Sequence, residues 1–480
     1  MGGCPGRGRR GGSPLVRLLS IAAGGLLLLW PALWNGYPLL FSDTGALLEM
    51  SLEPTMGWDK PWVYPPFMHL FHWRTALWPV AVAQAMLLSA VLWAVGSTVR
   101  AEPAEALGLP DRPFDNRGAG GSVQPTAYPA YPVQGWFHLA LCLVLAALTA
   151  APWFASLLMP DFFTPIAVLC LVLLAARRGW GWAVLGAVAI ASHLSHLPMA
   201  AACIVALGVL HRRWPWRPAG ALAGAVALLL LINSVGFGRA TLSPHGSVFA
   251  LARLIGDGPG RWYIDRVCPG AGLKLCAWQG RLATDSDDFL WAPYGPLWDR
   301  SLWGDAFGPV ALAPEAQRLV PAIIAAYPGA VATAALRNAA AQVVRMQVGD
   351  ALVPDYLNDA VAPKLALYFP AAELARYQGS RQLAGRLTAP PDWLQFGALG
   401  LGLIGTVGLL LTRRWRPFAG VVLVALLANA GTTGALSAPH DRYQARVAWL
   451  LLLPPLYAAI AGAMGARRST SAGFMRTRSV

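Results

Sequence analysis

The sequence contains little charge, and that charge is unevenly divided between the two signs. Only 12% of its 480 residues are Asp, Glu, Lys or Arg, and 56% are hydrophobic, whereas roughly a quarter of a typical soluble domain is charged. This composition argues against a soluble enzyme, a disordered scaffold or a disulfide-rich mini-domain. The 37 Lys and Arg outnumber the 23 Asp and Glu, but they lie in short clusters beside apolar runs. Nucleic acid is therefore not an expected partner.

The motifs of soluble enzymes are also missing. The sequence has no Walker A loop, no GxGxxG after a predicted strand, no HExxH and no GxSxG elbow. The missing nucleotide-binding loop argues against an ATP-driven pump. Function must therefore rest on polar residues beside apolar segments, where a charge is costly and is a functional hypothesis by default.

Apolar runs long enough, or nearly long enough, to span a membrane recur along the chain. We predict an all-α polytopic membrane protein with about ten transmembrane helices, some of them short or broken. The ten runs are at about 15–33, 77–99, 136–155, 162–176, 180–192, 197–210, 218–236, 396–411, 417–436 and 447–465.

Clusters of arginine orient this predicted bundle. When both termini are cytoplasmic, every cluster falls on the inner side, as the positive-inside rule requires. A cleaved signal peptide is the alternative for the first run, but that run lacks a small-x-small cleavage site. The clusters are Arg177 and Arg178, Arg212, Arg213 and Arg217, Arg413, Arg414 and Arg416, and Arg467 and Arg468.

This orientation divides the chain into segments on the two sides of the membrane. The longest outside segment, 237–395, is predicted to be mostly helical or irregular, and it is nearly neutral, with 14 basic and 13 acidic residues. The other predicted segments are a cytoplasmic tail at 1–14, a transmembrane core at 15–236 with a first outside loop at 35–76 and a flexible cytoplasmic linker at 100–135, C-terminal transmembrane helices at 396–465, and a cytoplasmic tail at 466–480.

One stretch is too short for the crossings that the charge pattern requires. Residues 178–212 cannot hold two full spans, yet a single span would reverse every later cluster. We predict two short helices that meet at SHLSHLP, with their ends satisfied by protein or by a water-filled cavity. Within this sequence, His193 and His196 could line the cavity or bond a neighbouring backbone carbonyl.

The cysteines separate into two groups. Cys142, Cys170 and Cys203 lie in apolar runs, where a thiol behaves as a small hydrophobe. Cys268 and Cys276, in CPGAGLKLC, are the only pair in the long outside segment, and the short loop between them permits a disulfide in an oxidising compartment. Two reduced buried cysteines are the alternative.

The first outside loop carries candidate catalytic and binding residues. Asp43, in FSDTG, follows a bulky apolar stretch at the membrane exit of the first span, and YPPFMHLFHWR presents His69, His72 and Arg74 before the second run. An aromatic belt at the level of the lipid headgroups is the alternative for the histidines. Asp161, in MPDFFTP, is predicted on the same side as Asp43, with a simple polar turn as its alternative.

The start of the last apolar run carries two more cations on that side. Arg442 and Arg446 are four residues apart, so on a helix they share one face. Each guanidinium can donate two parallel hydrogen bonds to a phosphate. The candidate binding residues of this stretch are His440, Asp441, Arg442, Tyr443 and Arg446, with His69, His72, Arg74 and His196 from the other segments.

Together these residues suit glycosyl transfer. A carboxylate, Asp43 or Asp161, would remove a proton from the acceptor hydroxyl, and the arginines would stabilise charge on a phosphate leaving group. The sequence identifies no cofactor with certainty. A divalent metal ion is left open, with Asp43 as its ligand if one binds.

The pattern resembles the GT-C class of integral-membrane glycosyltransferases, which includes lipid-phosphate-sugar-dependent mannosyl and aminoarabinose transferases. The similar features are FSDTG after the first span, YPPF before the second, and the terminal HDRYQARVAWLLLLP. The resemblance implies that Asp43 is the essential acid, with Asp161 a looser match to a second acid. It also implies a polyprenyl-phosphate sugar donor, an envelope glycan or lipid acceptor, and a multi-pass place in a bacterial inner membrane with the outside segment periplasmic.

Two other functions are compatible with the composition. A secondary transporter or lipid flippase would also contain broken helices and buried histidines, and a non-catalytic envelope-assembly protein would use the long outside segment for docking. Within that segment, DSDDFLWAPYGPLW places Asp285, Asp287 and Asp288 beside aromatics. We interpret it as a solvated acidic turn, with a sugar-contacting surface as the alternative.

Overall fold

The computed structural model describes residues 14–101, 131–176 and 179–463. The two predicted tails, apart from residue 14, and most of the predicted linker at 100–135 lie outside the described residues. Within the described ranges the chain is all-helical and contains no strand; its one isolated β-bridge joins Leu39 to Leu157.

In the described part of the chain, five helical segments are long and apolar enough to cross a membrane, and a sixth candidate is a pair of helices bent by 99°. This set indicates a multi-pass membrane protein. The five are α5 (Trp78–Ala101), α11 (Trp216–Phe237), α20 (Asp392–Leu409), α21 (Arg416–Leu436) and the segment Asp441–Ala463, which begins with α22 (Asp441–Ala448) and η5 (Trp449–Leu452); the bent pair is α16 (Gly308–Ala326) and α17 (Pro328–Val344).

The other five apolar runs also form helices, but shorter ones. They have 11 to 18 residues, against the ~20 that a span normally needs, so the count of ten spans stays a prediction. These helices are α1 (Pro14–Leu28), α6 (Tyr131–Leu148), α8 (Phe163–Ala175), α9 (Gly181–Ala191) and α10 (His196–His211).

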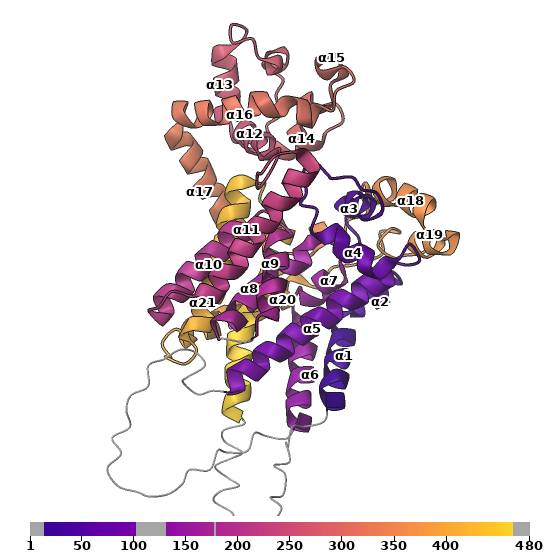
Figure 1. The fold of residues 1–480 in the computed structure, drawn as a ribbon, viewed down its shortest axis with the longest axis vertical. Coiled ribbons are helices and arrows are strands. Elements are labelled where there is room, and N and C mark those ends of the chain that lie inside the picture. Colours follow the sequence, from indigo (N-terminus) through magenta and orange to yellow (C-terminus); the bar gives the residue numbers. More distant parts are fainter. Residues whose placement is uncertain (1–13, 102–130, 177–178, 464–480) are drawn as a thin grey trace, which may run out of the picture.

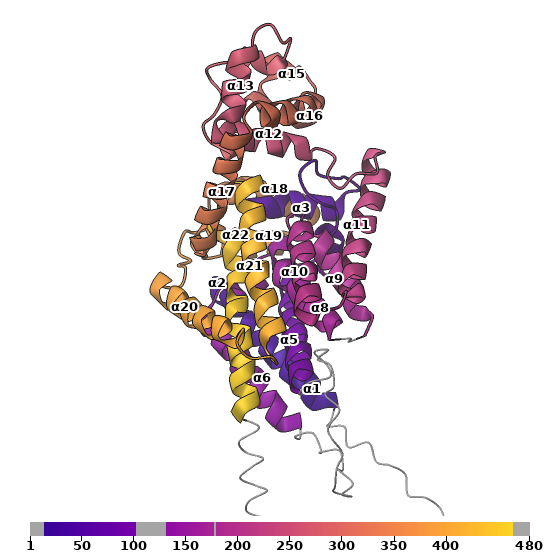
Figure 2. The same ribbon diagram turned by 90° about the vertical axis from the view of Figure 1, so that its left-hand side faces the viewer.

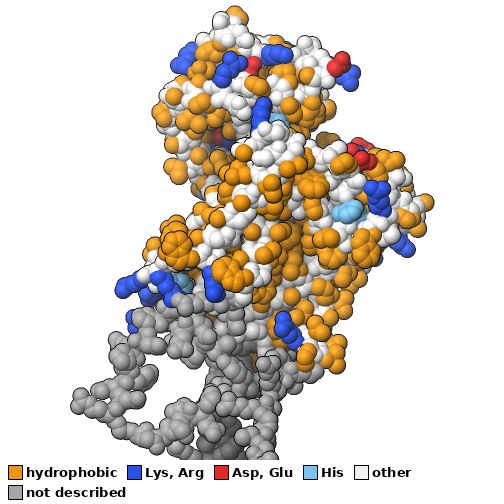
Figure 3. Space-filling view, viewed as in Figure 1, with side chains coloured by type: hydrophobic (Ala, Val, Ile, Leu, Met, Phe, Trp, Pro, Cys, Tyr) orange, Lys and Arg blue, Asp and Glu red, His pale blue; other side chains and the backbone are white. Residues whose placement is uncertain are grey.

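The helices form an elongated bundle with a separate helical group at one end (Figures 1 and 2). The connections from α10 to α11 and from α20 to α21, which carry arginines, lie at the opposite end (Figure 1). Figure 3 shows apolar side chains over the middle of one face, with Lys and Arg gathered towards the ends. This distribution is that of a protein whose middle contacts lipid.

The separate group, which we call the α12–α16 unit (residues 246–326), has its own hydrophobic core. Val248, Leu251, Phe289 and Leu312 are fully buried within it. A disulfide joins Cys268 to Cys276, with the Cα atoms 5.4 Å apart. The elements of the unit are α12 (Gly246–Asp257), α13 (Pro259–Val267), η2 (Lys274–Trp278), α14 (Ser286–Trp291), η3 (Pro296–Trp298), α15 (Arg300–Trp303) and α16.

The remainder of the predicted outside segment packs on the bundle instead of on this unit. In α18 (Leu357–Tyr368) and α19 (Ala371–Gln378), buried Val361 and Tyr377 belong to the core of the bundle. In α19, Glu373 is buried and accepts hydrogen bonds from the Tyr37 hydroxyl at 2.7 Å and from the Leu77 backbone N–H at 2.8 Å. Residues 237–395, predicted as one outside segment, therefore divide into two packing groups.

The loops that carry Asp43 and Asp161 run side by side. Leu39 N–H donates to the Ser156 carbonyl at 3.0 Å, and Leu158 N–H donates to the Leu39 carbonyl at 2.9 Å. This short parallel pairing joins the chain between α2 (Trp30–Asn35) and α3 (Ser42–Leu52) to the chain between α7 (Ala151–Ser156) and η1 (Pro160–Phe162). Two segments more than a hundred residues apart thus place their acids at the same end of the bundle.

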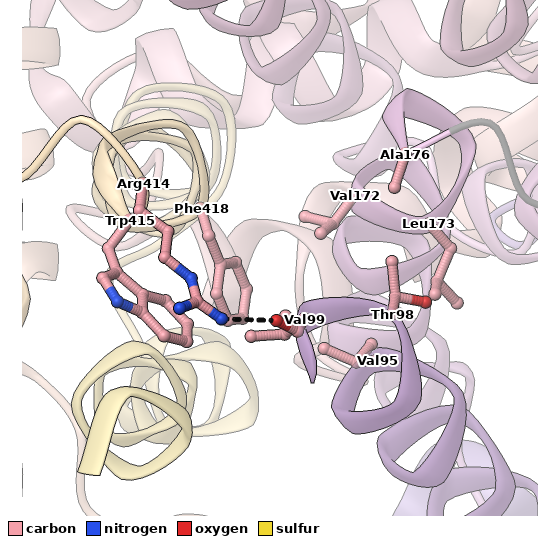
Figure 4. A pocket seen from close by; sticks show the side chains of 9 residues that line it. All are labelled: Val95, Thr98, Val99, Val172, Leu173, Ala176, Arg414, Trp415 and Phe418. Carbon is pink, nitrogen blue, oxygen red and sulfur yellow. Dashed lines mark hydrogen bonds between the residues drawn. The ribbon is translucent and has the colours of Figure 1, made fainter. Parts of the chain in front are cut away.

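A small cavity lies between α5, α8 and α21, near the arginine-rich end (Figure 4). It has a volume of about 20 Å³ and is mostly apolar, which is room for about one water molecule. Arg414 borders it and donates from Nη2 to the Val99 carbonyl at 3.1 Å. A cavity of this size is too small to hold a sugar substrate.

Candidate functional site

Asp43 lies in the first turn of α3, which begins at Ser42. The turn is closed by Thr44, whose Oγ1 accepts from the Phe41 backbone N–H at 2.9 Å and donates to the Leu158 carbonyl at 3.1 Å. An acid in the first turn is stabilised by the helix dipole. The Asp43 side chain is 29% exposed, so its carboxylate is held in place but remains open to a ligand.

Two cationic side chains flank this carboxylate. Lys60 Nζ lies 3.3 Å from Asp43 Oδ1, and Arg442 Nη2 lies 3.8 Å from Oδ2. Lys60 also contacts Asp59. Burial lowers the pKa of Lys60, but Asp43 and Asp59 outweigh burial and raise that pKa above its usual value, so Lys60 is cationic at neutral pH.

The described chain leaves part of the Arg442 guanidinium without hydrogen-bond acceptors. The backbone N–H of Arg442 donates to Asp350 Oδ2 at 2.9 Å, and the guanidinium Cζ lies 4.0 Å from the centre of the Phe41 ring. Among the described residues, no acceptor is within hydrogen-bonding distance of the buried Nη1. A buried guanidinium nitrogen without an acceptor is rare and needs a partner.

Arg446, one turn further along α22, is bound differently. It is completely buried, and its Nη1 donates to Asp161 Oδ1 at 3.0 Å. Its Nη2 donates to Ser195 Oγ at 3.0 Å and to Asn429 Oδ1 at 3.1 Å. The structure therefore brings Asp161 and Arg446 together, but as a closed ion pair inside the bundle.

A hydrogen-bonded chain leads from this pair through Ser195 to His193. Ser195 Oγ and the Ser195 backbone N–H both lie close to His193 Nδ1, at 2.7 and 3.2 Å, and the His193 ring centre lies 6.5 Å from that of Tyr443. His196 instead points into the bundle, where its ring nitrogens bond Thr164 Oγ1 at 2.7 Å and the Ala189 carbonyl at 2.8 Å. The protein itself thus satisfies the turn between the short helices α9 and α10, and His193 is the histidine beside the site.

The residues just before Arg442 connect to neighbouring helices. His440 Nε2 lies 2.8 Å from Asp287 Oδ2 of α14, so this acid of the predicted acidic turn is paired. Asp441 accepts from the Gln347 backbone N–H at 3.1 Å. Tyr443 lies between the two arginines, with its ring centre 5.0 Å from Arg442 Cζ and 5.2 Å from Arg446 Cζ.

The predicted binding residues of α4 (Tyr64–His72) and the turn after it lie at the other end of α3, away from Asp43. His69 Nδ1 is 2.7 Å from the Ser51 carbonyl, and Arg74 Nη2 donates to the Leu52 carbonyl at 3.0 Å. His72 is buried against Ser51; burial, with His69 and Arg74 nearby, lowers its pKa to about 4. These three side chains form hydrogen bonds with the last two residues of α3, Ser51 and Leu52.

Gly45, in the FSDTG sequence, positions the helix that carries Asp43. A Cβ atom there would lie 2.1 Å from the carbonyl oxygen of Ala360 on α18. We expect Gly45→Ala to push α3 away from α18 and to lower the free energy of unfolding by about 1–3 kcal/mol, the usual cost of overpacking.

Thermal denaturation of the purified protein, with Gly431→Ala as the control, measures this effect. Gly431 has no atoms within 4 Å of the equivalent position. If both variants were as stable as the intact chain, the close packing of α3 on α18 would be contradicted.

Lys60, which contacts Asp43, is not among the candidates chosen from the sequence, and His193, which lies by Tyr443, was considered there only as a residue that lines a cavity or bonds a backbone carbonyl. The only sequence signal for Lys60 was its place in a loop that already contained candidate residues.

No three His, Cys, Asp or Glu side chains of the described residues converge on a metal-sized site. The groups nearest the Asp43 carboxylate are cations, so the residues present do not suit a divalent metal at Asp43.

The chain was compared with family models, curated proteins and solved structures, and none of them matches it.

Proposed function

We propose that the chain is a membrane glycosyltransferase of the GT-C type. It transfers a sugar from a polyprenyl-phosphate donor to an acceptor of the cell envelope, at the periplasmic face of a bacterial inner membrane. The α12–α16 unit then lies in the periplasm, both termini are cytoplasmic, and the short apolar helices complete about ten spans. The arginines at the end opposite this unit support that orientation.

The observation that carries the proposal is the carboxylate of Asp43 held between Lys60 and Arg442. Arg442 also has a buried nitrogen without an acceptor among the described residues. A partly exposed acid beside two cations, at the end of apolar helices, suits a substrate that joins a hydroxyl nucleophile to a phosphate leaving group.

In the proposed reaction, Asp43 accepts the proton of the acceptor hydroxyl while that oxygen bonds to the anomeric carbon of the sugar. The bond from the anomeric carbon to the phosphate oxygen breaks, and its electron pair remains on the phosphate. As Asp43 becomes neutral, Lys60 and Arg442 lose their carboxylate partner and stabilise the new phosphate charge. Proton transfer and leaving-group stabilisation are thereby linked through the same two ion pairs.

Asp161 and Arg446 then act as positioning residues. Their closed pair fixes α22 against η1, and α22 carries Arg442. The proposed phosphate contact therefore rests on Arg442 and Lys60, and Asp43 is the single catalytic base.

A binding experiment tests the role of Arg442. We expect Arg442→Ala to weaken binding of farnesyl phosphate, a short polyprenyl phosphate, by about 10- to 100-fold, since a hydrogen-bonded charge pair contributes about 1.5–3 kcal/mol. Arg442→Lys should bind farnesyl phosphate with an affinity between those of the intact protein and Arg442→Ala, because lysine keeps the charge but loses the forked geometry.

Calorimetric titration of the full-length protein in nanodiscs measures the affinity. Arg318→Ala, which removes an exposed arginine of α16, is the control and should bind like the intact protein. Equal affinity for Arg442→Ala and Arg318→Ala would remove Arg442 from the phosphate site.

A further inference from the structure

Helix α14 connects the two chain segments that flank Asp43. At one end of this helix, Asp287 Oδ2 is 2.8 Å from His440 Nε2, just before α22. At the other end, the centre of the Trp291 ring is 5.7 Å from Lys60 Nζ, which itself lies 3.3 Å from Asp43 Oδ1. Buried Phe289 anchors the helix in the core of the α12–α16 unit. The indole of Trp291 is thus held near Lys60, which contacts the proposed catalytic carboxylate of Asp43.

Neighbouring aromatic rings hold this indole. The ring centres of Trp58 and Phe249 lie 5.7 and 6.3 Å from that of Trp291, and they stack on each other at 5.0 Å. Phe307 extends the cluster, with its ring centre 6.3 Å from that of Trp58. These contacts leave Trp291 45% exposed, which makes it a rigid aromatic surface open to a ligand.

Other tryptophans of the α12–α16 unit are used differently. The indole N–H groups of Trp278, Trp298 and Trp303 donate to Asp299 Oδ2, the Leu290 carbonyl and the Pro296 carbonyl, at 2.9, 3.0 and 2.7 Å. Within the described part of the chain, the Trp291 N–H has no such acceptor. Trp291 thus packs on Trp58 and Phe249, while its exposed surface and its N–H remain available to a ligand.

The groups around Trp291 define the chemistry of a ligand. A sugar ring presents a face of C–H groups, which packs on the electron-rich face of an indole, and a rim of hydroxyls. Asp288, exposed three residues before Trp291 on α14, can accept hydrogen bonds from such hydroxyls, and the Trp291 N–H can donate to them. A lipid tail would leave the carboxylates unpaired, so a saccharide suits this surface better.

We propose that Trp291 is the platform of a saccharide-binding subsite, and that the acceptor of the reaction is therefore a carbohydrate. The inference that the acceptor is a carbohydrate rests on the proposed glycosyltransferase function. Arg442 belongs to α22, at the start of an apolar helical segment, so a membrane-bound donor is expected on that side. Trp291 belongs to the α12–α16 unit at the end of the molecule (Figure 1), which is the side from which a glycan approaches.

The test is saccharide binding by the full-length protein in nanodiscs, first on an array of bacterial-envelope oligosaccharides and then by titration with the saccharide that binds best. We expect the intact protein and Asp43→Asn to bind the same saccharide. Trp291→Ala should bind at least about tenfold more weakly, and Trp291→Tyr, which keeps a ring, should lose no more than about threefold. Trp262→Ala is the matched control, because Trp262 is 50% exposed on α13 of the same unit.

Two results would overturn the subsite. One is that the intact protein binds no saccharide of the array; the other is that Trp291→Ala and Trp262→Ala bind equally well. Binding that depends on Trp291 in a protein that transfers no sugar would keep the subsite and refute the glycosyltransferase. Loss of transfer in Asp43→Asn, together with intact binding by Trp291→Ala, would refute the subsite alone.

Discussion

Asp43→Asn is expected to lower the rate of sugar transfer by about 10²- to 10⁴-fold, the contribution of a positioned general base. Asparagine keeps the size of the side chain but cannot accept the proton of the acceptor hydroxyl. Lys60 keeps its contact with Asp59 in this variant, and Arg442 keeps its backbone bond to Asp350. Because ion pairs of partly exposed side chains contribute little stability, about 0–1 kcal/mol, the variant should fold like the intact protein.

Initial rates of transfer, measured with membranes that contain equal amounts of each variant, give this effect. Glu49→Gln is the control. Glu49 lies on the same helix, its side chain is 42% exposed, and it pairs with Lys364 at 2.8 Å, so its amide variant should transfer at the intact rate. Transfer by Asp43→Asn at the rate of this control would show that Asp43 is not the base.

Asp161→Asn is expected to have the largest effect on stability. It leaves the fully buried guanidinium of Arg446 without its carboxylate partner, and breaking a buried ion pair from one side costs about 3–5 kcal/mol. Arg446→Met should cost a similar amount, because the buried Asp161 then has no cation. Thermal denaturation of the purified protein in nanodiscs measures both.

A double variant separates the ion pair from general packing. Asp161→Leu with Arg446→Met removes both charges and should be more stable than Arg446→Met alone, since an apolar pair carries no uncompensated charge. Lys364→Met, which breaks the exposed pair with Glu49, should change stability by no more than about 1 kcal/mol. If Asp161→Asn unfolded at the same temperature as Lys364→Met, the ion pair of Asp161 and Arg446 would not be holding α22 in place.

The helical architecture could be predicted from the sequence because burial in lipid imposes a local signal. Where they are described, the apolar runs are largely helical, although the first run is divided between α1 and α2 and the run at 136–155 between α6 and α7. The two short helices around residues 192–195 were predicted from the length of that stretch and the charge clusters beside it. The division of residues 237–395 was not predicted, because both parts form helices with buried apolar residues and the sequence pattern does not specify what each part packs against. Only the tertiary fold determines which of them packs on the bundle.

Part of the site could be predicted from the predicted side of the membrane on which each residue lies. The approach of Arg442 to Asp43 follows from placing both on one side of the membrane. The four-residue spacing predicts that Arg446 and Arg442 share one helix face. It does not predict that Arg446 forms a buried ion pair with Asp161. Likewise SHLSHLP indicates two histidines, and only the hydrogen bonds of the folded chain show that His193, not His196, lies beside Tyr443.

The most direct test of the glycosyltransferase is the glycan content of cells that carry the intact chain, a deletion, or Asp43→Asn at equal abundance. We predict that the deletion and Asp43→Asn lose the same sugar from an envelope glycan and accumulate the same polyprenyl-phosphate sugar. Envelope glycans that stay unchanged in the deletion, or an Asp43→Asn strain identical to the intact one, would contradict this account and favour a transporter, a lipid flippase or an assembly protein.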